Sequence, residues 1–399
     1  MVPSSYYIAT TNDQKLRIGR TIGYYAAFIA LGLISASLGP TLPSLADHTQ
    51  TRLSEISFLF TARGLGYLLG SLQGGRLYDR KTGHPLMAVM LLGAASSLAL
   101  APVIPHLWLL TGLMLLLGFT EGAVDVGGNA LLVWVHRDRV GPFMNGLHFF
   151  FGVGAFLSPL IVAQAILASG DIYWAYWILA ALLIPVVAYL LRIPSPAIQH
   201  AAENGGREKK PLRLVALIVA FFFLYVGAEV SFGGWIFTYA TRSGMSDLTS
   251  AAYLTSAFWG SLTVGRLLSI PLAARLRPRT ILLSDLVGCL FSVSVILLWP
   301  GSPAAIWVGT LGIGLCMASI FPTTLTFAGR HMTITGKVTS WFFVGASLGG
   351  MTLPWLIGQL FERFGPQSTM FTILLDLIVA LGIFTALMAT SSRRDTRQA

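Results

Sequence analysis

Long apolar stretches recur along this chain, and they constrain its fold more than any other feature. Each is long enough to cross a bilayer as a helix, for which about 20 predominantly apolar residues suffice. Hydrophobic residues make up 55% of the 399 positions and charged residues only 11%, whereas soluble domains carry about 25% charged residues. The sequence therefore predicts an all-α membrane protein with twelve transmembrane helices. The expected spans lie near residues 20–43, 53–78, 84–104, 107–135, 141–169, 171–192, 212–240, 248–274, 279–300, 303–329, 333–361 and 366–390.

The distribution of basic residues predicts how the chain is oriented. The formal net charge is +10, yet the lysines and arginines are spread over short loops at the helix ends. Both termini and every second loop are rich in them, and only Arg52, Arg242 and Arg363 fall in the loops on the opposite side. Cytoplasmic loops carry such an excess. We therefore expect both termini in the cytoplasm, a bacterial plasma (inner) membrane, and no nucleic-acid partner.

Two parts of the chain resemble each other at an offset of about 195 residues. Residues 1–192 and 212–399 each hold six expected spans, and the polar residues 193–211 between them are typical of a cytoplasmic linker. Internal repeats of this kind are typical of secondary transporters, which bind substrate at mid-membrane between the repeats. We predict two pseudo-symmetric six-helix halves. The matching positions include Gly70 and Gly265, Arg80 and Arg275, and Phe149–Gly152 and Phe342–Gly345.

A polar stripe interrupts the apolar span at 107–135. Glu121, Asp125 and Asn129 are spaced four residues apart, which places them on one face of a helix. Carboxylates inside a membrane are costly unless they face protein, water or an ion, and loss of water favours their protonated form. We predict that Glu121 and Asp125 carry or sense a coupling ion and that Asn129 binds a hydroxyl of the substrate. Alternatively, Asp125 and Asn129 offer oxygen ligands suited to Na⁺. A buried structural pair with Arg63, in the span at 53–78, is the alternative.

The spans at 212–240 and 141–169 hold further polar candidates. Glu229 is a third central acid, and Tyr225 shares its helix face, which favours a role in substrate or ion binding. Asn145 and His148 share a face of the other span, and Asn is able to bind a sugar hydroxyl as donor and acceptor. For His148, a packed histidine bonded to a neighbour is the alternative.

Two tryptophans are candidates for the apolar side of a sugar ring. Trp341 aligns with His148 in the repeat, and Trp235 follows Gly233-Gly234, which is able to break a helix. Packing, or a place in the aromatic belt at the membrane surface, is the alternative for both tryptophans.

The loop after the second span resembles a family signature. It reads Gly75-Arg-Leu-Tyr-Asp-Arg-Lys-Thr-Gly-His84 and is similar to the Gly-x-Leu-x-Asp-Arg-x-Gly-Arg signature of the major facilitator superfamily. Asp79 and Arg80 match that signature, which implies that they hold the cytoplasmic ends of helices together and act in conformational change. One extra residue precedes Gly83, and His84 stands where the signature has an arginine. We assign conformational roles to Arg63 and Arg266 as well.

Three further segments resemble the fucose permease and sodium-dependent glucose transporter branch of that superfamily. They are Asp125–Asn129, Gly141–Pro159 and Val226–Trp235. The resemblance implies symport of a neutral sugar driven by H⁺ or Na⁺. Residues 23–43 lack the carboxylate that the fucose permease pattern has there, so that family's proton mechanism does not transfer whole.

Other functions remain open alternatives at this point. A proton-coupled exporter of amphipathic or cationic drugs would also place acids in an aromatic cavity, and a lipid-handling transporter is a third candidate. An enzyme is not expected, because the sequence has no hydrolase elbow, phosphate loop or Cys/His metal cluster. We expect no cofactor, and a monomer in the bilayer.

Overall fold

The computed structural model describes residues 11–197, 212–332 and 336–398, and within these ranges the chain forms helices and no strand. The linker predicted at 193–211 therefore lies mostly outside the described residues. The helices are α1 (Thr11–Ser35), α2 (Leu38–His48), α3 (Leu53–Ile56), α4 (Phe58–Tyr78), α5 (Gly83–Leu100), η1 (Ala101–Val103), α6 (Leu107–His136), η2 (Arg137–Arg139), α7 (Gly141–Ser169), α8 (Tyr173–Arg192), α9 (Leu212–Arg242), α10 (Leu248–Arg275), α11 (Pro278–Leu298), α12 (Pro303–Met317), α13 (Ile320–His331), α14 (Gly336–Phe364) and α15 (Gln367–Gln398).

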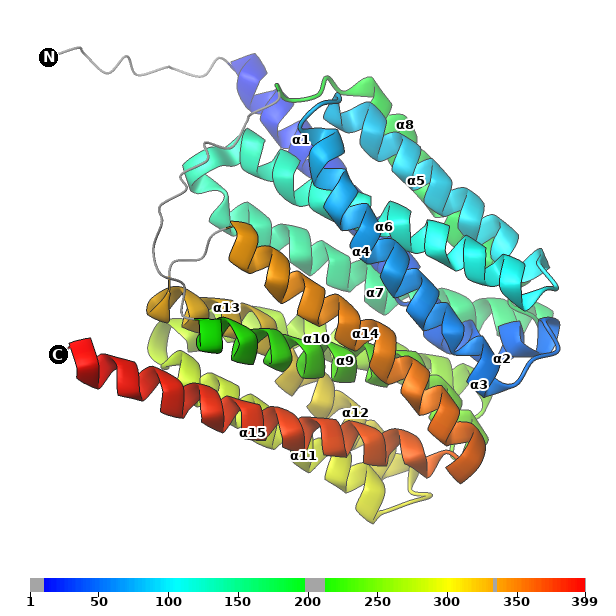
Figure 1. The fold of residues 1–399 in the computed structure, drawn as a ribbon. Helices are drawn as coiled ribbons and strands as arrows, with labels where there is room; N and C mark the ends of the chain where they lie inside the picture. The colour runs from blue at the N-terminus through cyan, green and yellow to red at the C-terminus, as the bar shows by residue number, and fades with distance from the viewer. Residues whose placement is uncertain (1–10, 198–211, 333–335, 399) are drawn as a thin grey trace, which may run out of the picture.

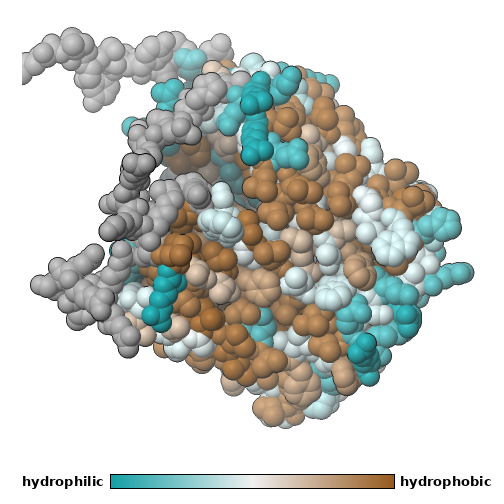
Figure 2. Space-filling view, in the orientation of Figure 1, coloured by the Kyte–Doolittle hydropathy of each residue, from teal (hydrophilic) through white to brown (hydrophobic). Residues whose placement is uncertain are grey.

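Eleven helical stretches among the described residues are long and apolar enough to cross a membrane. α4 is not among them, because Arg63, Gln73 and Arg76 lower its mean hydropathy, but it packs inside the bundle against α6 and α14. With α4 as the twelfth crossing helix, the predicted all-α membrane fold is confirmed. Figure 2 shows apolar side chains over the middle of the visible face and hydrophilic ones toward the two ends of the helices.

The same helix pairs recur in the first and second parts of the chain. α4 packs on α6, α1 on α7 and α5 on α8, and correspondingly α10 packs on α12, α9 on α14 and α11 on α15. In Figure 1 helices α1–α8 form the upper part of the molecule and α9–α15 the lower part. The two parts meet where α7 packs on α10 and α4 on α14. The repeat seen in the sequence therefore corresponds to repeated packing.

Two of the predicted spans are broken helices. The span expected at 20–43 divides into α1 and α2 at Ala36 and Ser37, and the span at 303–329 divides into α12 and α13 at Ala318 and Ser319. A proline follows each break, Pro40 in one case and Pro322 in the other. Proline lacks an N–H and clashes with the carbonyl four residues earlier, which here belongs to Ala36 and to Ala318. Both breaks therefore leave carbonyl groups inside the membrane that need other partners.

Glycines spaced four residues apart lie where the backbones of two helices touch. A Cβ atom added at Gly66 or Gly70 would collide with carbonyl oxygens of α6, and one at Gly118 or Gly122 would collide with those of α4. Gly349 meets the backbone of α9 in the same way. Small residues at four-residue spacing permit such close approach, and these glycines are therefore packing positions between helices.

Hydrogen bonds between α1–α8 and α9–α15 lie at one end of the bundle. Gln359 Nε2 donates to Ser54 O at 2.7 Å and Thr61 Oγ1 to Met351 O at 3.2 Å. Ser256 Oγ donates to Phe156 O at 2.6 Å. Ser57 Oγ likewise donates to Trp355 O and Gln164 Nε2 to Tyr253 Oη, and these bonds fall at or beyond the middle of the helices, on the side away from both termini. The structure is therefore closed on that side, and in Figure 1 the ribbons diverge toward the side of the termini.

Candidate functional site

Glu121 and Arg63 form a buried ion pair between α6 and α4. Arg63 Nε lies 2.6 Å from Glu121 Oε2, and Arg63 Nη2 lies 2.6 Å from Glu121 Oε1. Ser35 Oγ donates to Glu121 Oε1 at 3.2 Å, and Glu121 is only 2% exposed. A two-pronged contact of this kind is the strongest arrangement of an arginine with a carboxylate. Arg63 therefore neutralises Glu121 in this conformation.

Arg63 also closes the break in the first span. Its Nη1 donates to Ser35 O at 3.2 Å and its Nη2 to Ile34 O at 3.1 Å. These carbonyls belong to the last turn of α1, where the regular helical bonding ends, and Ile34 O also accepts from the Ser37 hydroxyl at 2.8 Å. The positive charge also lies at the end of the helix that carries the negative pole of its dipole. One side chain thus joins α1, α4 and α6.

Asp125 lies one turn beyond Glu121 and has different partners. Tyr67 Oη donates to Asp125 Oδ2 at 2.5 Å, and Asn129 Nδ2 donates to Asp125 Oδ1 at 3.1 Å. Asp125 and Asn129 are both half-buried. The predicted stripe therefore comes together as a second cluster, which contains a carboxylate and an amide oxygen but no cation from the described side chains.

Glu229 on α9 lies near Arg266 on α10. The shortest oxygen–nitrogen distance between them is 3.9 Å, at the outer limit of an ion pair. Tyr225 is fully buried beside Glu229, and its hydroxyl donates to Met317 O at 3.0 Å. Because Met317 ends α12, Tyr225 supplies a partner to a carbonyl at the second helix break. Glu229 is held less tightly than Glu121.

His148 lies on α7 and contacts α1. Its ring meets that of Phe28 edge-on at 5.8 Å. His148 and Asn145 are both exposed, on the part of α7 that lies toward the termini. The predicted shared face is therefore accessible on the side where the two parts diverge.

The two tryptophans differ in their surroundings. Trp235 is 0% exposed, donates from Nε1 to Pro354 O at 3.0 Å and stacks on Phe361. It has no surface for a substrate in this conformation, because it lies in the packing between α9 and α14. Trp341 on α14 is 52% exposed. Of the two, Trp341 alone presents an aromatic face here.

The signature loop divides into an exposed part and a buried part. Asp79 and Arg80 are exposed at the end of α4. His84 is buried, where its ring contacts Tyr24 Oη at 2.9 Å and Ile193 O at 2.8 Å, and its backbone N–H donates to Ser195 Oγ at 2.9 Å. The histidine that departs from the signature therefore ties the end of α8 to α1 and α5.

Sequence reasoning missed Tyr67 and Ser35 as neighbours of the two acids. A signal for Tyr67 was present, because Arg63 and Tyr67 are four residues apart on α4, as Glu121 and Asp125 are on α6. Two helices in backbone contact bring such pairs opposite each other. No comparable pattern marks Ser35, whose position follows from the break after it.

Within the described parts of the chain, twelve crossing helices with repeated packing, and charged side chains near mid-membrane between them, are typical of a multi-pass membrane transporter. A family model of the major facilitator superfamily matches residues 23–354. The chain belongs to the major facilitator superfamily.

Its curated relatives include sodium-dependent glucose transporters. The human sodium-dependent glucose transporter 1 is 33% identical over 397 residues, which cover 90% of this chain and 76% of that protein. The mouse sodium-dependent glucose transporter 1A is 31% identical, over 91% of this chain and 94% of that protein. The human major facilitator superfamily domain-containing protein 4A is 26% identical, with 87% of each chain covered. The predicted resemblance to this branch is confirmed.

Solved structures share the fold. A point mutant of the nucleoside transporter NupG has a TM-score of 0.74 at 15% identity, over 94% of this chain and 99% of that one. A bacterial homologue of the human lysosomal transporter Spinster has a TM-score of 0.73 at 12% identity, over 94% and 97%. At such low identity these likenesses concern the fold alone.

Proposed function

We propose that this protein carries a neutral sugar together with H⁺ or Na⁺ by alternating access. The observation that carries the proposal is the half-buried cluster of Asp125, Asn129 and Tyr67 on α4 and α6. The names of the relatives, sodium-dependent glucose transporters, support both the class of substrate and an ion requirement. Superfamily membership supports the transport mechanism.

The coupling ion binds at Asp125 in this proposal. Glu121 is already neutralised by Arg63, so it is the least available of the three central acids in this conformation. Asp125 has only neutral partners, and its carboxylate together with the Asn129 amide oxygen offers the hard ligands that Na⁺ prefers. A proton on Asp125 would neutralise the same charge. Glu229 is the second candidate, because its distance from Arg266 leaves its charge incompletely compensated.

The sugar binds between the two parts of the molecule, on the side that diverges. Asn145 and His148 supply polar groups from α7, and Trp341 supplies an aromatic face from α14. Tyr225 and Trp235 enter the site only if the packing around α9 changes in another state. The excess of basic residues near the termini supports a cytoplasmic position for this side, in a plasma (inner) membrane, with Asp79 and Arg80 meeting partners when it closes.

The test is uptake of a labelled hexose panel by proteoliposomes, with a Na⁺ gradient and a pH gradient imposed separately. We expect one sugar to accumulate under one gradient. Asp125→Asn should abolish accumulation above equilibrium while leaving exchange of sugar across the membrane measurable, because the ion and the sugar bind at different residues. Asp376→Asn is the matched control, since Asp376 is a buried acid on α15, away from the cluster.

Two results would overturn the proposal. Gradient-driven accumulation that persists in Asp125→Asn would exclude Asp125 as the coupling site. Absence of hexose uptake under either gradient, with efflux of an amphipathic cation against a pH gradient, would favour a drug exporter, which also requires acids in an aromatic site.

A further inference from the structure

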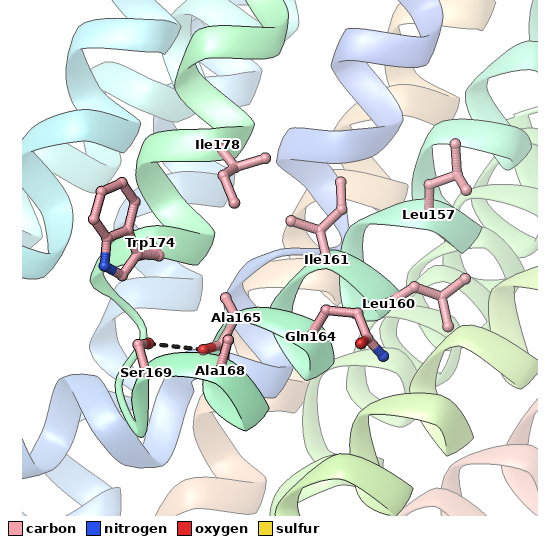
Figure 3. A pocket seen from close by; sticks show the side chains of 9 residues that line it. All are labelled: Leu157, Leu160, Ile161, Gln164, Ala165, Ala168, Ser169, Trp174 and Ile178. Atoms are coloured by element: carbon pink, nitrogen blue, oxygen red, sulfur yellow. Dashed lines mark hydrogen bonds between the residues drawn. The ribbon is translucent and has the colours of Figure 1, made fainter.

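A groove of about 520 Å³ lies between α7 and α8, near the end of the bundle away from the termini. Figure 3 shows Ile161 on α7 and Ile178 on α8 pointing into the space between the two helices, with Leu157 farther along α7. The groove is lined by Leu157, Leu160, Ile161, Gln164, Ala165, Ala168, Ser169, Trp174 and Ile178. Its volume falls within the range of about 300–1,000 Å³ that holds small ligands.

The medium around this groove determines what fills it. α7 and α8 both span the membrane, and Leu157, Trp174 and Ile178 are among the exposed apolar side chains. The groove therefore opens to the hydrocarbon of the bilayer rather than to water. The molecules present there at high concentration are lipids, so a matching shape is occupied by an acyl chain.

The mouth of the groove lies at the membrane surface. α7 ends at Gly170, whose φ of 75° is left-handed, and α8 begins at Tyr173. Trp174, 56% exposed, thus stands at the depth where tryptophan is enriched beside lipid headgroups. A chain that enters here comes from a lipid of the leaflet on this side.

The side chains of Gln164 and Ser169 in the groove are hydrogen-bonded within the protein. Gln164 Nε2 donates to Tyr253 Oη at 2.6 Å, and Ser169 Oγ donates to Ala165 O at 2.7 Å (Figure 3). None of the lining residues is charged. The groove therefore selects the apolar chain of a lipid and makes no demand on its headgroup.

We propose that this groove binds one acyl chain of a phospholipid from the leaflet away from the chain termini. Because Gln164 both lines the groove and reaches Tyr253 on α10, the bound chain lies beside the contact that closes this side of the molecule. The groove is separate from the central acids, so lipid binding there is tested independently of the proposed transport of sugar.

Photolabelling in proteoliposomes tests the site. The vesicles consist of phosphatidylcholine with a small fraction of phosphatidylcholine that carries a diazirine midway along one acyl chain. After irradiation, labelled peptides are mapped by mass spectrometry. We expect labels concentrated on residues 157–169 and 174–178, above the level on other lipid-facing helices such as α11.

Two variants fill the groove from opposite walls, and one serves as the matched control. Ala168→Trp and Ile178→Trp should each lower labelling of the groove severalfold. Leu167→Trp should leave it unchanged, because Leu167 is 67% exposed but lies outside the lining. Thermal midpoints of the three variants establish that they are folded.

Labelling spread evenly over all lipid-facing helices would overturn the proposal. So would unchanged labelling in both Ala168→Trp and Ile178→Trp when the proteins are folded. Cross-links between two copies of the chain through this groove, with little lipid label, would instead identify a protein interface and also contradict it.

Discussion

The contact between Arg63 and Glu121 leads to the sharpest prediction. Arg63 makes hydrogen bonds to both Glu121 oxygens and to the carbonyls of Ile34 and Ser35. Glu121→Gln removes the negative charge but leaves Arg63 its two carbonyl partners. Arg63→Met removes all four bonds. Both variants should therefore be destabilised, and Arg63→Met more so.

The size of each loss in stability follows from the groups that the substitution leaves without a partner. Removing one partner of a buried ion pair costs about 3–5 kcal/mol, which we expect for Glu121→Gln. Arg63→Met also removes the donor to Ser35 O, at about 1–3 kcal/mol, whereas Ile34 O keeps the hydroxyl and the backbone N–H of Ser37 as donors. In the double variant neither charge remains, so its cost should fall short of the sum of the two single costs by about 0.5–3 kcal/mol.

Equilibrium unfolding in mixed detergent micelles measures these free energies. Arg80→Met is the control, since Arg80 is an exposed arginine at the end of the same helix and should change stability by less than about 0.5 kcal/mol. Costs that add within about 0.5 kcal/mol in the double variant would refute the coupling of Arg63 to Glu121. A larger cost for Glu121→Gln than for Arg63→Met would refute the role at the helix break.

Three further predictions follow from single contacts. Tyr67→Phe removes the hydroxyl that stabilises charged Asp125, so the ion dependence of uptake should shift, with half-maximal uptake at a higher pH where H⁺ is the coupling ion; an unchanged ion dependence in proteoliposomes would count against the site. Tyr225→Phe leaves Met317 O without its donor and should cost about 1–3 kcal/mol in the same unfolding assay; no loss would show that another donor replaces it. The backbone N–H of Ser250 donates to Asp247, the N-cap of α10, and lowers the pKa of that carboxyl. The carboxylate therefore stabilises the fold fully at pH values above its ordinary pKa of 3.8. This stabilisation is lost as the pH falls through the lowered pKa. Asp247→Ala should lower the thermal midpoint at pH 7, and the difference from the midpoint of the unchanged protein should narrow below pH 3.8. A difference that does not depend on pH would contradict this.

Much of the fold was predictable because the membrane imposes simple rules. Backbone groups in hydrocarbon must be paired within the segment, so a long apolar run becomes a helix. The spacing of Glu121, Asp125 and Asn129 likewise predicted one face, since helical periodicity determines which residues align. The four-residue spacing of Gly66 and Gly70 is also typical of close packing between membrane helices.

The choice of partners was not predictable in the same way. Arg63 was an expected counter-ion for the acids on α6, but the spacing left open which acid it would contact. It lies on Glu121 because the backbones of α4 and α6 touch at Gly66 and Gly118, and that contact determines the relative depth of the two helices. Trp235 shows the same difficulty, because its exposure depends on α14, which lies more than 100 residues away.

The two helix breaks connect these observations. At the first, Arg63 binds the carbonyls of Ile34 and Ser35 and also Glu121. At the second, Tyr225 binds the carbonyl of Met317 and lies beside Glu229. In each case the side chain that donates to a carbonyl group at the helix break also lies against an acidic side chain in the membrane. A change in the charge of that acid would therefore alter the group that holds the break, and under the proposed ion coupling this would link ion binding to helix movement.

The second break has an additional acidic partner that the first lacks. Ser319 Oγ, at the junction of α12 and α13, donates to the carboxylate of Asp285 on α11. The first break is held by an arginine bearing a full positive charge, whereas the second is held by hydroxyl groups beside two carboxylates. Arg63 holds the first break through charge-assisted bonds to two carbonyls, whereas Tyr225 Oη binds Met317 O as a neutral pair, which is weaker. We therefore expect α12 and α13 to rearrange more readily than α1 and α2 when the molecule changes state.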